Sequence, residues 1–176
     1  KDLKIPITSD VHETSQIDTL ESLLDIIQIP AFLCRQTDLI RVAAQTKKIV
    51  NVKKGQFLSH QEIENVILKI ENQNNKKILI TERGNSFGYN YLVNDFKGVH
   101  FMKQFGYPII FDSTHSVQLP GGMGIKSGGA REYVVPLSKS AAALRLAGFF
   151  IETHPNPEKA LSDGPNMMHL HNMPKL

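Results

Sequence analysis

Short apolar segments alternate with amphipathic segments along the whole chain. Near-continuous apolar runs predict buried strands at residues 5–7, 25–29, 48–52, 77–80, 108–111 and 149–151. Between these runs, apolar positions recur every three or four residues, which predicts helices at residues 14–24, 36–48, 59–71 and 136–147 and a less regular helical segment at 92–105. This alternation indicates a parallel sheet whose strands are joined by helical crossovers.

Two architectures fit this pattern, an open doubly wound sheet and a (β/α)8 barrel. Five of the six predicted strands run directly into charged residues, which are Asp10 and His12, Lys53 and Lys54, Glu82 and Arg83, Asp112 and His115, and Glu152 and His154. Barrel enzymes draw their site from the C-terminal ends of many strands, whereas an open sheet concentrates its site at one switch point. A dinucleotide-binding sheet would also carry GxGxxG after its first strand, and the sequence has no such motif there.

The strand ends therefore favour the barrel. We predict an α/β fold of the (β/α)8 TIM-barrel type, incomplete here, with about six of the eight strands. Residues 1–176 are expected to form a single barrel domain that lacks the first strand–helix units and the last helix.

Composition narrows the classes of partner. The net charge is only +3, and the 20 Lys and Arg residues are interspersed with 17 Asp and Glu residues. Because no basic block stands out, we expect no nucleic-acid partner. No apolar run approaches the roughly 18 residues that span a bilayer, so we expect no membrane segment. Cys34 is the only cysteine, which excludes an internal disulfide and suits a reducing compartment such as the cytoplasm.

Cations at the strand ends suggest an anion site. Lys53 and Arg83 are predicted to point into the barrel mouth, where an Arg fork and a Lys point charge suit a phosphate or carboxylate. Lys54 should alternate to the other side of the sheet. The Gly-rich segment 127–131 is either a phosphate-cradling nest, a mobile lid or a plain connection. For the three cations, the alternative interpretation is that they are solvated surface charges.

Three further residues form a possible metal set. His115, Glu152 and Asp163 offer one imidazole and two carboxylates, a combination that suits Fe, Mn or Zn with open positions for water or substrate. Their long sequence separation leaves open a second interpretation, in which each residue only caps a strand end or pairs with a Lys side chain.

Seven sequence words follow one another along nearly the whole chain. They are TSDVH at 8–12, QIPAFLCRQTD at 28–38, NVKKGQF at 51–57, TERGNSFGY at 81–89, FDSTHSVQ at 111–118, SGG at 127–129 and ETHPNPEKALSDGP at 152–165. Together, and in this order, they resemble the 3-deoxy-D-manno-octulosonate 8-phosphate synthase family. The resemblance implies a (β/α)8 barrel, usually a homotetramer. It also implies a transferase that condenses phosphoenolpyruvate with D-arabinose 5-phosphate and releases phosphate, on the route to bacterial lipopolysaccharide.

The resemblance also implies roles for individual residues. Lys53 and Arg83 would bind the carboxylate and phosphate of phosphoenolpyruvate, and Asp10 would lie near the sugar hydroxyls. Phe32 and Arg35 would reach the site of a neighbouring subunit. The implied catalytic residues are Asp10, Lys53 and His115, and the implied substrate-binding residues are Gln28, Phe32, Arg35, Lys53, Arg83 and His115.

The family has two classes that differ in metal use. In the metal-dependent class a Cys on the first barrel strand joins a His, a Glu and an Asp, and in the other class an Asn replaces that Cys. The deciding position is not in this sequence, but HSVQLPGG at 115–122 and LSD at 161–163 resemble the metal-dependent class. The resemblance thus implies that His115, Glu152 and Asp163 hold a divalent ion. It also implies that this chain alone lacks part of both substrate sites and has little or no activity.

Two rival functions remain. The first is 3-deoxy-D-arabino-heptulosonate 7-phosphate synthase, which uses erythrose 4-phosphate, although PAFL at 30–33 and HSVQ at 115–118 argue against it. The second is a non-catalytic barrel that binds a sugar phosphate or serves as a scaffold. A barrel of that kind should have neutral strand ends, the opposite of what this sequence shows.

Overall fold

The main sheet of the protein has six parallel strands. A computed structural model describes residues 3–88, 90–121 and 128–176. In the described residues, the sheet order is β1-β2-β3-β4-β7-β10. The strands are β1 (Thr8–Asp10), β2 (Ile26–Ile29), β3 (Ile49–Lys53), β4 (Ile78–Glu82), β7 (Ile109–Asp112) and β10 (Gly148–Phe150).

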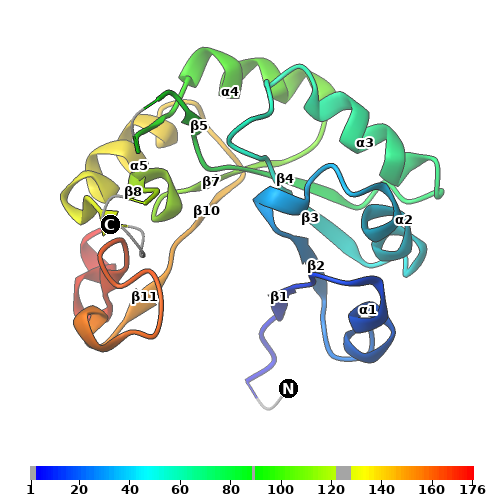
Figure 1. Cartoon of the computed structure of the whole chain (residues 1–176), viewed down its shortest axis with the longest axis horizontal. Coiled ribbons are helices and arrows are strands. Elements are labelled where there is room, and N and C mark those ends of the chain that lie inside the picture. The colour runs from blue at the N-terminus through cyan, green and yellow to red at the C-terminus, as the bar shows by residue number, and fades with distance from the viewer. Residues whose placement is uncertain (1–2, 89, 122–127) are drawn as a thin grey trace.

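Helices cover the outer side of this sheet. They are α1 (Thr14–Leu20), α2 (Thr37–Gln45), α3 (Ile63–Glu71), α4 (Phe96–Met102) and α5 (Val134–Ala142). Figure 1 shows the sheet curled into an arc, with the helices along its convex side and β1 and β10 at its two ends. A curled parallel sheet with outer helices is the wall of a (β/α)8 barrel, which confirms the predicted fold class and the six strands.

Shorter elements lie in the segments between the main strands and helices and after β10. Within the described part of the chain, three two-stranded ribbons join β5 (Asn85–Ser86) to β6 (Leu92–Val93), β8 (Gln118–Leu119) to β9 (Gly128–Gly129), and β11 (Thr153–His154) to β12 (Met168–His169). The 3-10 turns are η1 (Ala31–Leu33), η2 (Lys103–Phe105), η3 (His115–Val117), η4 (Arg131–Tyr133), η5 (Pro157–Lys159) and η6 (Leu170–Lys175). No helix in the described ranges is long and apolar enough to cross a bilayer.

The hydrophobic core lies between the sheet and the outer helices. Successive side chains of a strand point to opposite faces, so each strand gives one set to the helices and one to the barrel interior. The outward set is apolar and almost fully buried, and includes Ile27, Ile29, Val50, Val52, Ile78 and Ile80. Leu39, Ile40, Ala43 and Ala44 of α2 and Ile63, Val66, Ile67 and Ile70 of α3 pack in the same core. The inward set is therefore free to be polar.

Several predicted boundaries were wrong. The helices predicted at 14–24, 92–105 and 136–147 are Thr14–Leu20, Phe96–Met102 and Val134–Ala142, and Leu92–Val93 belongs to a strand. The first strand is Thr8–Asp10 and not residues 5–7, because Pro6 has no N–H to give a ladder and Ile5 and Ile7 remain exposed. The helix predicted from residue 59 begins at Ile63, and the residues before it form a turn. Ser59 and Glu62 close that turn through two reciprocal bonds, from Ser59 N–H to Glu62 Oε2 and from Glu62 N–H to Ser59 Oγ.

Candidate active site

A row of hydrogen-bonded side chains crosses four neighbouring strands on the concave face. Gln28 Nε2 donates to Asp10 Oδ1 at 2.5 Å, and Asn51 Nδ2 donates to Gln28 Oε1 at 2.8 Å. Thr81 Oγ1 then donates to Asn51 Oδ1 at 2.8 Å. Asp10, Gln28 and Asn51 are register partners, so the strand pairing itself brings them together. The row fixes the predicted residues Asp10 and Gln28 against the barrel wall.

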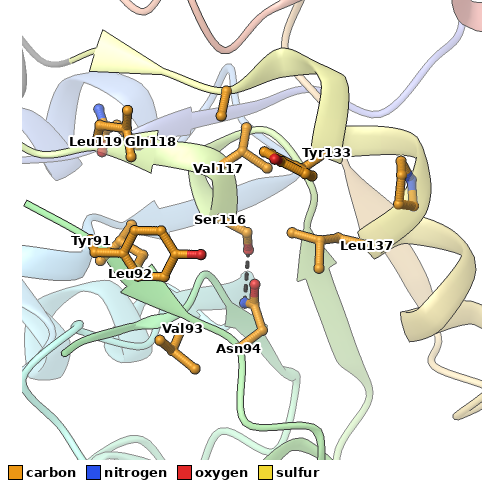
Figure 2. Close-up of a pocket in the computed structure, with 12 residues that line it drawn as sticks. Tyr91, Leu92, Val93, Asn94, Ser116, Val117, Gln118, Leu119, Tyr133 and Leu137 are labelled. Carbon is orange, nitrogen blue, oxygen red and sulfur yellow. Dashed lines mark hydrogen bonds between the residues drawn. The ribbon is translucent and has the colours of Figure 1, made fainter.

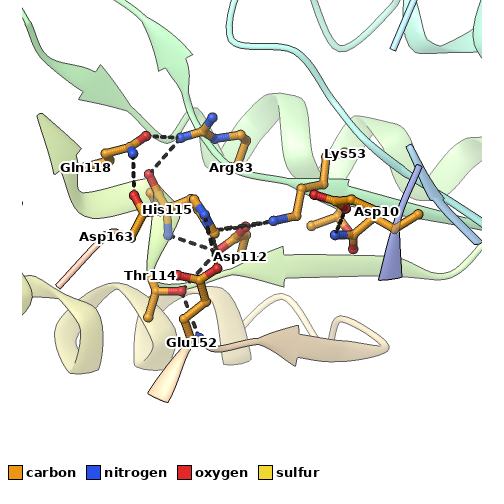
Figure 3. A network of polar contacts seen from close by, with 12 residues as sticks. Asp10, Lys53, Arg83, Asp112, Thr114, His115, Gln118, Glu152 and Asp163 are labelled. Atoms are coloured by element: carbon orange, nitrogen blue, oxygen red, sulfur yellow. Dashed lines mark hydrogen bonds and ion pairs between the residues drawn. The ribbon is translucent and has the colours of Figure 1, made fainter. Parts of the chain in front are cut away.

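A buried carboxylate, Asp112 at the end of β7, joins two of the predicted catalytic residues. Its Oδ2 lies 3.0 Å from Lys53 Nζ and 2.9 Å from His115 Nδ1, and its Oδ1 accepts the His115 backbone N–H at 2.9 Å (Figure 3). Lys53 Nζ also lies 3.8 Å from the ring centroid of Phe150, a favourable cation–π contact. Lys53 and His115 are therefore held in one fixed arrangement.

The ionisation of Asp112 decides the tautomer of His115. Burial acts to raise the pKa of Asp112, but the hydrogen bonds from His115 and the charge of Lys53 outweigh it and lower the pKa to about 2. Asp112 is thus ionised at neutral pH and can only accept hydrogen bonds. His115 Nδ1 must then donate, which leaves Nε2 available to ligate a metal or move a proton.

Arg83 follows β4 and lies beside this centre. One NH2 group of its guanidinium donates to Gln118 Oε1 at 2.6 Å and to the His115 carbonyl at 3.4 Å. Burial lowers the pKa of Arg83, although the nearby carboxylates, first Asp112, oppose this shift. Its Nε is buried and has no hydrogen-bond partner in the part of the chain that the structure describes. A buried guanidinium with an unused donor is suited to an anionic ligand.

His115, Glu152 and Asp163 converge on one point. One ligand atom from each lies within 4.8 Å of the others. The Glu152 backbone is held by Thr114 Oγ1 at 3.1 Å, while Asp163 takes the left-handed conformation with φ of 53° and accepts a bond from Gln118 Nε2 at 2.8 Å. The predicted metal set is thus assembled from three separate segments of the chain.

These three residues fit a divalent cation. Burial raises the pKa of Glu152, an effect that the charge of His115 opposes and the charge of Asp163 reinforces. Glu152 Oε2 is buried and has no hydrogen-bond partner among the described residues. A bound cation would compensate two close carboxylates and an unsatisfied oxygen, and one nitrogen with two oxygens suits Fe, Mn or Zn.

A sequence model of the DAHP synthetase I family matches residues 1–176. The chain belongs to the DAHP synthetase I family. Its relatives include the 2-dehydro-3-deoxyphosphooctonate aldolase of Geobacter sp. (strain M21), 54% identical over 174 residues, which are 99% of this chain and 64% of the relative. The same-named protein of Chelativorans sp. (strain BNC1) is 53% identical over 176 residues, 100% of this chain and 64% of the relative. The chain spans about 64% of the length of these curated relatives, whose name is that of the enzyme the seven sequence words resemble.

Several site residues of this DAHP synthetase I family member were not predicted as such. Gln118 bridges Arg83 and Asp163. In the sequence it appeared only as part of the segment FDSTHSVQ that resembles the family, and no role was predicted for it. Asn51 and Thr81 extend the polar row, and a signal for Asn51 existed, because it interrupts an apolar strand two residues before Lys53, on the same face. Asp112 was noted as a strand-end charge, but no role was predicted for it.

Other predicted residues lie apart from the centre. Phe32 on η1 is 70% exposed, and Arg35 is exposed just after it. Among the described residues, no hydrogen bond or ion pair joins either of them to the remaining candidate residues, so their roles toward a neighbouring subunit stay predictions. Ser127, the first residue of the predicted nest or lid, lies outside the described residues, while Gly129 in the middle of that segment pairs with Gln118 in the β8–β9 ribbon.

Proposed function

We propose that this chain forms the phosphoenolpyruvate-binding and metal-binding wall of a transferase. That enzyme joins phosphoenolpyruvate to D-arabinose 5-phosphate and gives 3-deoxy-D-manno-octulosonate 8-phosphate and inorganic phosphate. The observation that carries the proposal is the convergence of Lys53 and Arg83 on His115 at the C-terminal edge of a barrel sheet. The printed name of the relatives supports the same reaction.

The reaction needs cations beside a group that can move a proton. The enol carbon of phosphoenolpyruvate attacks the sugar aldehyde, water attacks the electron-poor carbon that results, and phosphate leaves. In the proposal, Arg83 and Lys53 bind the carboxylate and phosphate of phosphoenolpyruvate, and Asp10 accepts hydrogen bonds from the sugar hydroxyls. His115 has only Nε2 left for this chemistry, because Asp112 occupies Nδ1, and Nε2 serves as the metal ligand when an ion is bound and exchanges a proton only when none is.

A divalent ion completes the proposed site. His115, Glu152 and Asp163 would hold it, and the ion would supply Lewis-acid activation of the aldehyde or of water. We further propose a homo-oligomer, a tetramer in the complete enzyme, in which Phe32 and Arg35 reach a neighbouring subunit. The 70% exposure of the Phe32 side chain supports a contact of this kind.

The two rival functions are less well supported. A synthase that takes erythrose 4-phosphate would fit the family description, but the relatives carry the name of the enzyme that forms the eight-carbon product. A barrel that serves only as a scaffold gains nothing from buried charged side chains at its strand ends, because burying a charge costs several kcal/mol unless it is well compensated. Asp112 has no exposed area and Lys53 is 6% exposed, which supports a binding role for the strand ends.

Calorimetric titration of the chain with phosphoenolpyruvate, with Mn²⁺ present in all samples, tests the anion site. We expect binding, and we expect Arg83→Ala and Lys53→Met to weaken it by about tenfold or more each, because each removes a charge-assisted contact. Lys139→Ala, which removes an exposed cation on α5, is the matched control and should leave the affinity unchanged. An Arg83→Ala chain that binds like the unmodified one would refute the proposal.

The choice of sugar can be tested in a chimera. This chain replaces the matching 174-residue segment of the Geobacter sp. (strain M21) relative, and phosphate release is measured with each sugar phosphate. We expect turnover with arabinose 5-phosphate. Turnover only with erythrose 4-phosphate would establish the first rival, and phosphoenolpyruvate binding without any turnover would support the second.

A further inference from the structure

A second group of buried ionisable residues lies on the outer side of the same strand ends. Lys54 and Glu82 have no exposed area, and His60 is 5% exposed. Lys54 directly follows Lys53, and Glu82 directly precedes Arg83, so each outer residue alternates with an inner one. The prediction that Lys54 turns away from the mouth is confirmed by its contacts, which all lie on the outer side.

Lys54 ties two loops together. Its Nζ donates to the carbonyls of Leu58 at 3.0 Å and Gly55 at 3.3 Å, which belong to the loop after β3. The same Nζ donates to Asn85 Oδ1 at 2.5 Å, in the loop after β4, and lies 3.5 Å from Glu82 Oε2. One ammonium group thus fixes the loop that follows Lys53 against the loop that follows Arg83.

Glu82 fixes the backbone that follows Arg83. It is the last residue of β4, and its Oε1 accepts the Gly84 N–H at 2.6 Å. Gly84 has φ of +89°, which an L side chain rarely adopts, so the turn after Arg83 depends on this glycine and on the Glu82 bond. Glu82 Oε2 faces His60 Nε2 at 3.2 Å, and the His60 ring packs on Gly98 of α4, where a Cβ atom would clash with it.

Packing alone does not account for this group. Apolar side chains of the same volume would fill the space at equal or lower cost, because burying an ion pair takes both charges out of water. What an ion pair adds is direction, since its hydrogen bonds hold particular backbone groups at fixed distances. Here those backbone groups follow Lys53 and Arg83 directly in the chain.

We propose that Lys54 and Glu82, supported by His60, are positioning residues for the anion site. They contact no substrate and act through the loops that carry Lys53 and Arg83, fixing the separation of the two inner cations so that a single phosphoenolpyruvate molecule reaches both. This inference rests on the proposed function, because it assigns the outer pair a task in the same binding site.

Three variants separate positioning from packing. Lys54→Met with Glu82→Leu removes both charges and keeps the space filled, so the chain should fold. Lys54→Met with Glu82→Gln also removes both charges but keeps an acceptor for the Gly84 N–H. Ile70→Ala opens a cavity in α3, away from the strand ends, and is the control for general destabilisation.

We expect the Met and Leu variant to weaken phosphoenolpyruvate binding by about tenfold or more, since displacements of about 1 Å at a site have effects of this size. The Met and Gln variant should lose less affinity than the Met and Leu variant, because it keeps an acceptor for the Gly84 N–H. A role in packing alone would not produce this difference. Ile70→Ala should bind as the unmodified chain does. The proposal would be overturned if all three variants bound phosphoenolpyruvate as tightly as the unmodified chain. It would also be overturned if Ile70→Ala lost as much affinity as the Met and Leu variant.

Amide hydrogen exchange tests the positioning role of Lys54 and Glu82 without any substrate. In the Met and Leu variant the Gly84 and Ser86 amides should exchange about tenfold faster, while those of Ile27 and Ile29 in β2 keep their protection. If Arg83→Ala leaves phosphoenolpyruvate binding unchanged, the proposed function fails and exchange alone decides whether Lys54 and Glu82 hold the loops. Unchanged protection at Gly84 refutes the positioning role in either case.

Discussion

Replacing Asp112 by Asn tests whether the buried centre is held by charge. The two side chains have nearly the same shape, and Asn keeps an oxygen that can accept the His115 backbone N–H. What is lost is the negative charge 3.0 Å from Lys53 Nζ. Lys53 would then be a buried cation without its nearest counter-ion.

The magnitude follows from this distance. At 3.0 Å and an effective dielectric constant of about 20, the attraction between Lys53 and Asp112 is roughly 5 kcal/mol, most of which offsets the cost of burying the two charges. Removal of one partner of a buried pair costs about 3–5 kcal/mol, so we expect Asp112→Asn to lower the free energy of unfolding by about 3 kcal/mol. Combining it with Lys53→Met should recover part of this loss, giving a coupling energy of about 2 kcal/mol.

Urea denaturation followed by circular dichroism measures these energies. The four chains of the double-mutant cycle are compared at neutral pH with a chelator present, so that bound metal does not contribute. Asp18→Asn, which changes an exposed carboxylate of α1, is the control and should alter the free energy of unfolding by less than about 0.5 kcal/mol. If the effects of Asp112→Asn and Lys53→Met add within about 0.5 kcal/mol, the two charges are not coupled and the reasoning fails.

Two further predictions concern the metal set and one tyrosine. Titration with Mn²⁺ or Zn²⁺ should show that Glu152→Gln, Asp163→Asn and Gln118→Leu each weaken ion binding by about tenfold or more, and wild-type affinity in all three would exclude this ligand set. The Tyr107 hydroxyl donates to Glu71 at 2.5 Å, which with burial raises its pKa to about 12, above the ordinary value of 10.0. The stability from this bond is therefore full below pH 10 and is lost as the pH rises toward 12, and in an ultraviolet titration Tyr107→Phe should remove the phenol that titrates near pH 12.

The sequence was most informative where local geometry decides the outcome. The side-chain period of a strand is two residues, so placing Lys53 inside immediately placed Lys54 outside, and both positions are confirmed by their contacts. The order of the main strands and helices could be predicted because the spacing of apolar residues is also a local property of the sequence. The first strand was placed wrongly because apolar residues around Pro6 resemble a strand in composition but cannot supply its hydrogen bonds.

Contacts between distant segments could not be predicted in this way. Gln118 and Asp163 are 45 positions apart, and their bond depends on how the β8–β9 ribbon and the loop after β11 meet in space. His60 lies in a turn before α3, and nothing in its neighbourhood indicates that Glu82 approaches it to 3.2 Å. A resemblance can name such residues only if they fall in a known motif, and it does not say what they contact.

The charges of the inner centre explain why an anion site and a metal set lie side by side. Lys53 and Arg83 bring two positive charges, and Asp112, Glu152 and Asp163 bring up to three negative ones, so the group sums to −1 when all are ionised and His115 is neutral. A site with that balance repels a phosphate ester. Addition of a divalent cation changes the sum from −1 to +1, which attracts one. In the proposed function, the carboxylates that would hold the ion thus also make anion binding depend on it, and Asp112, held ionised by Lys53 and His115, contributes one of those negative charges.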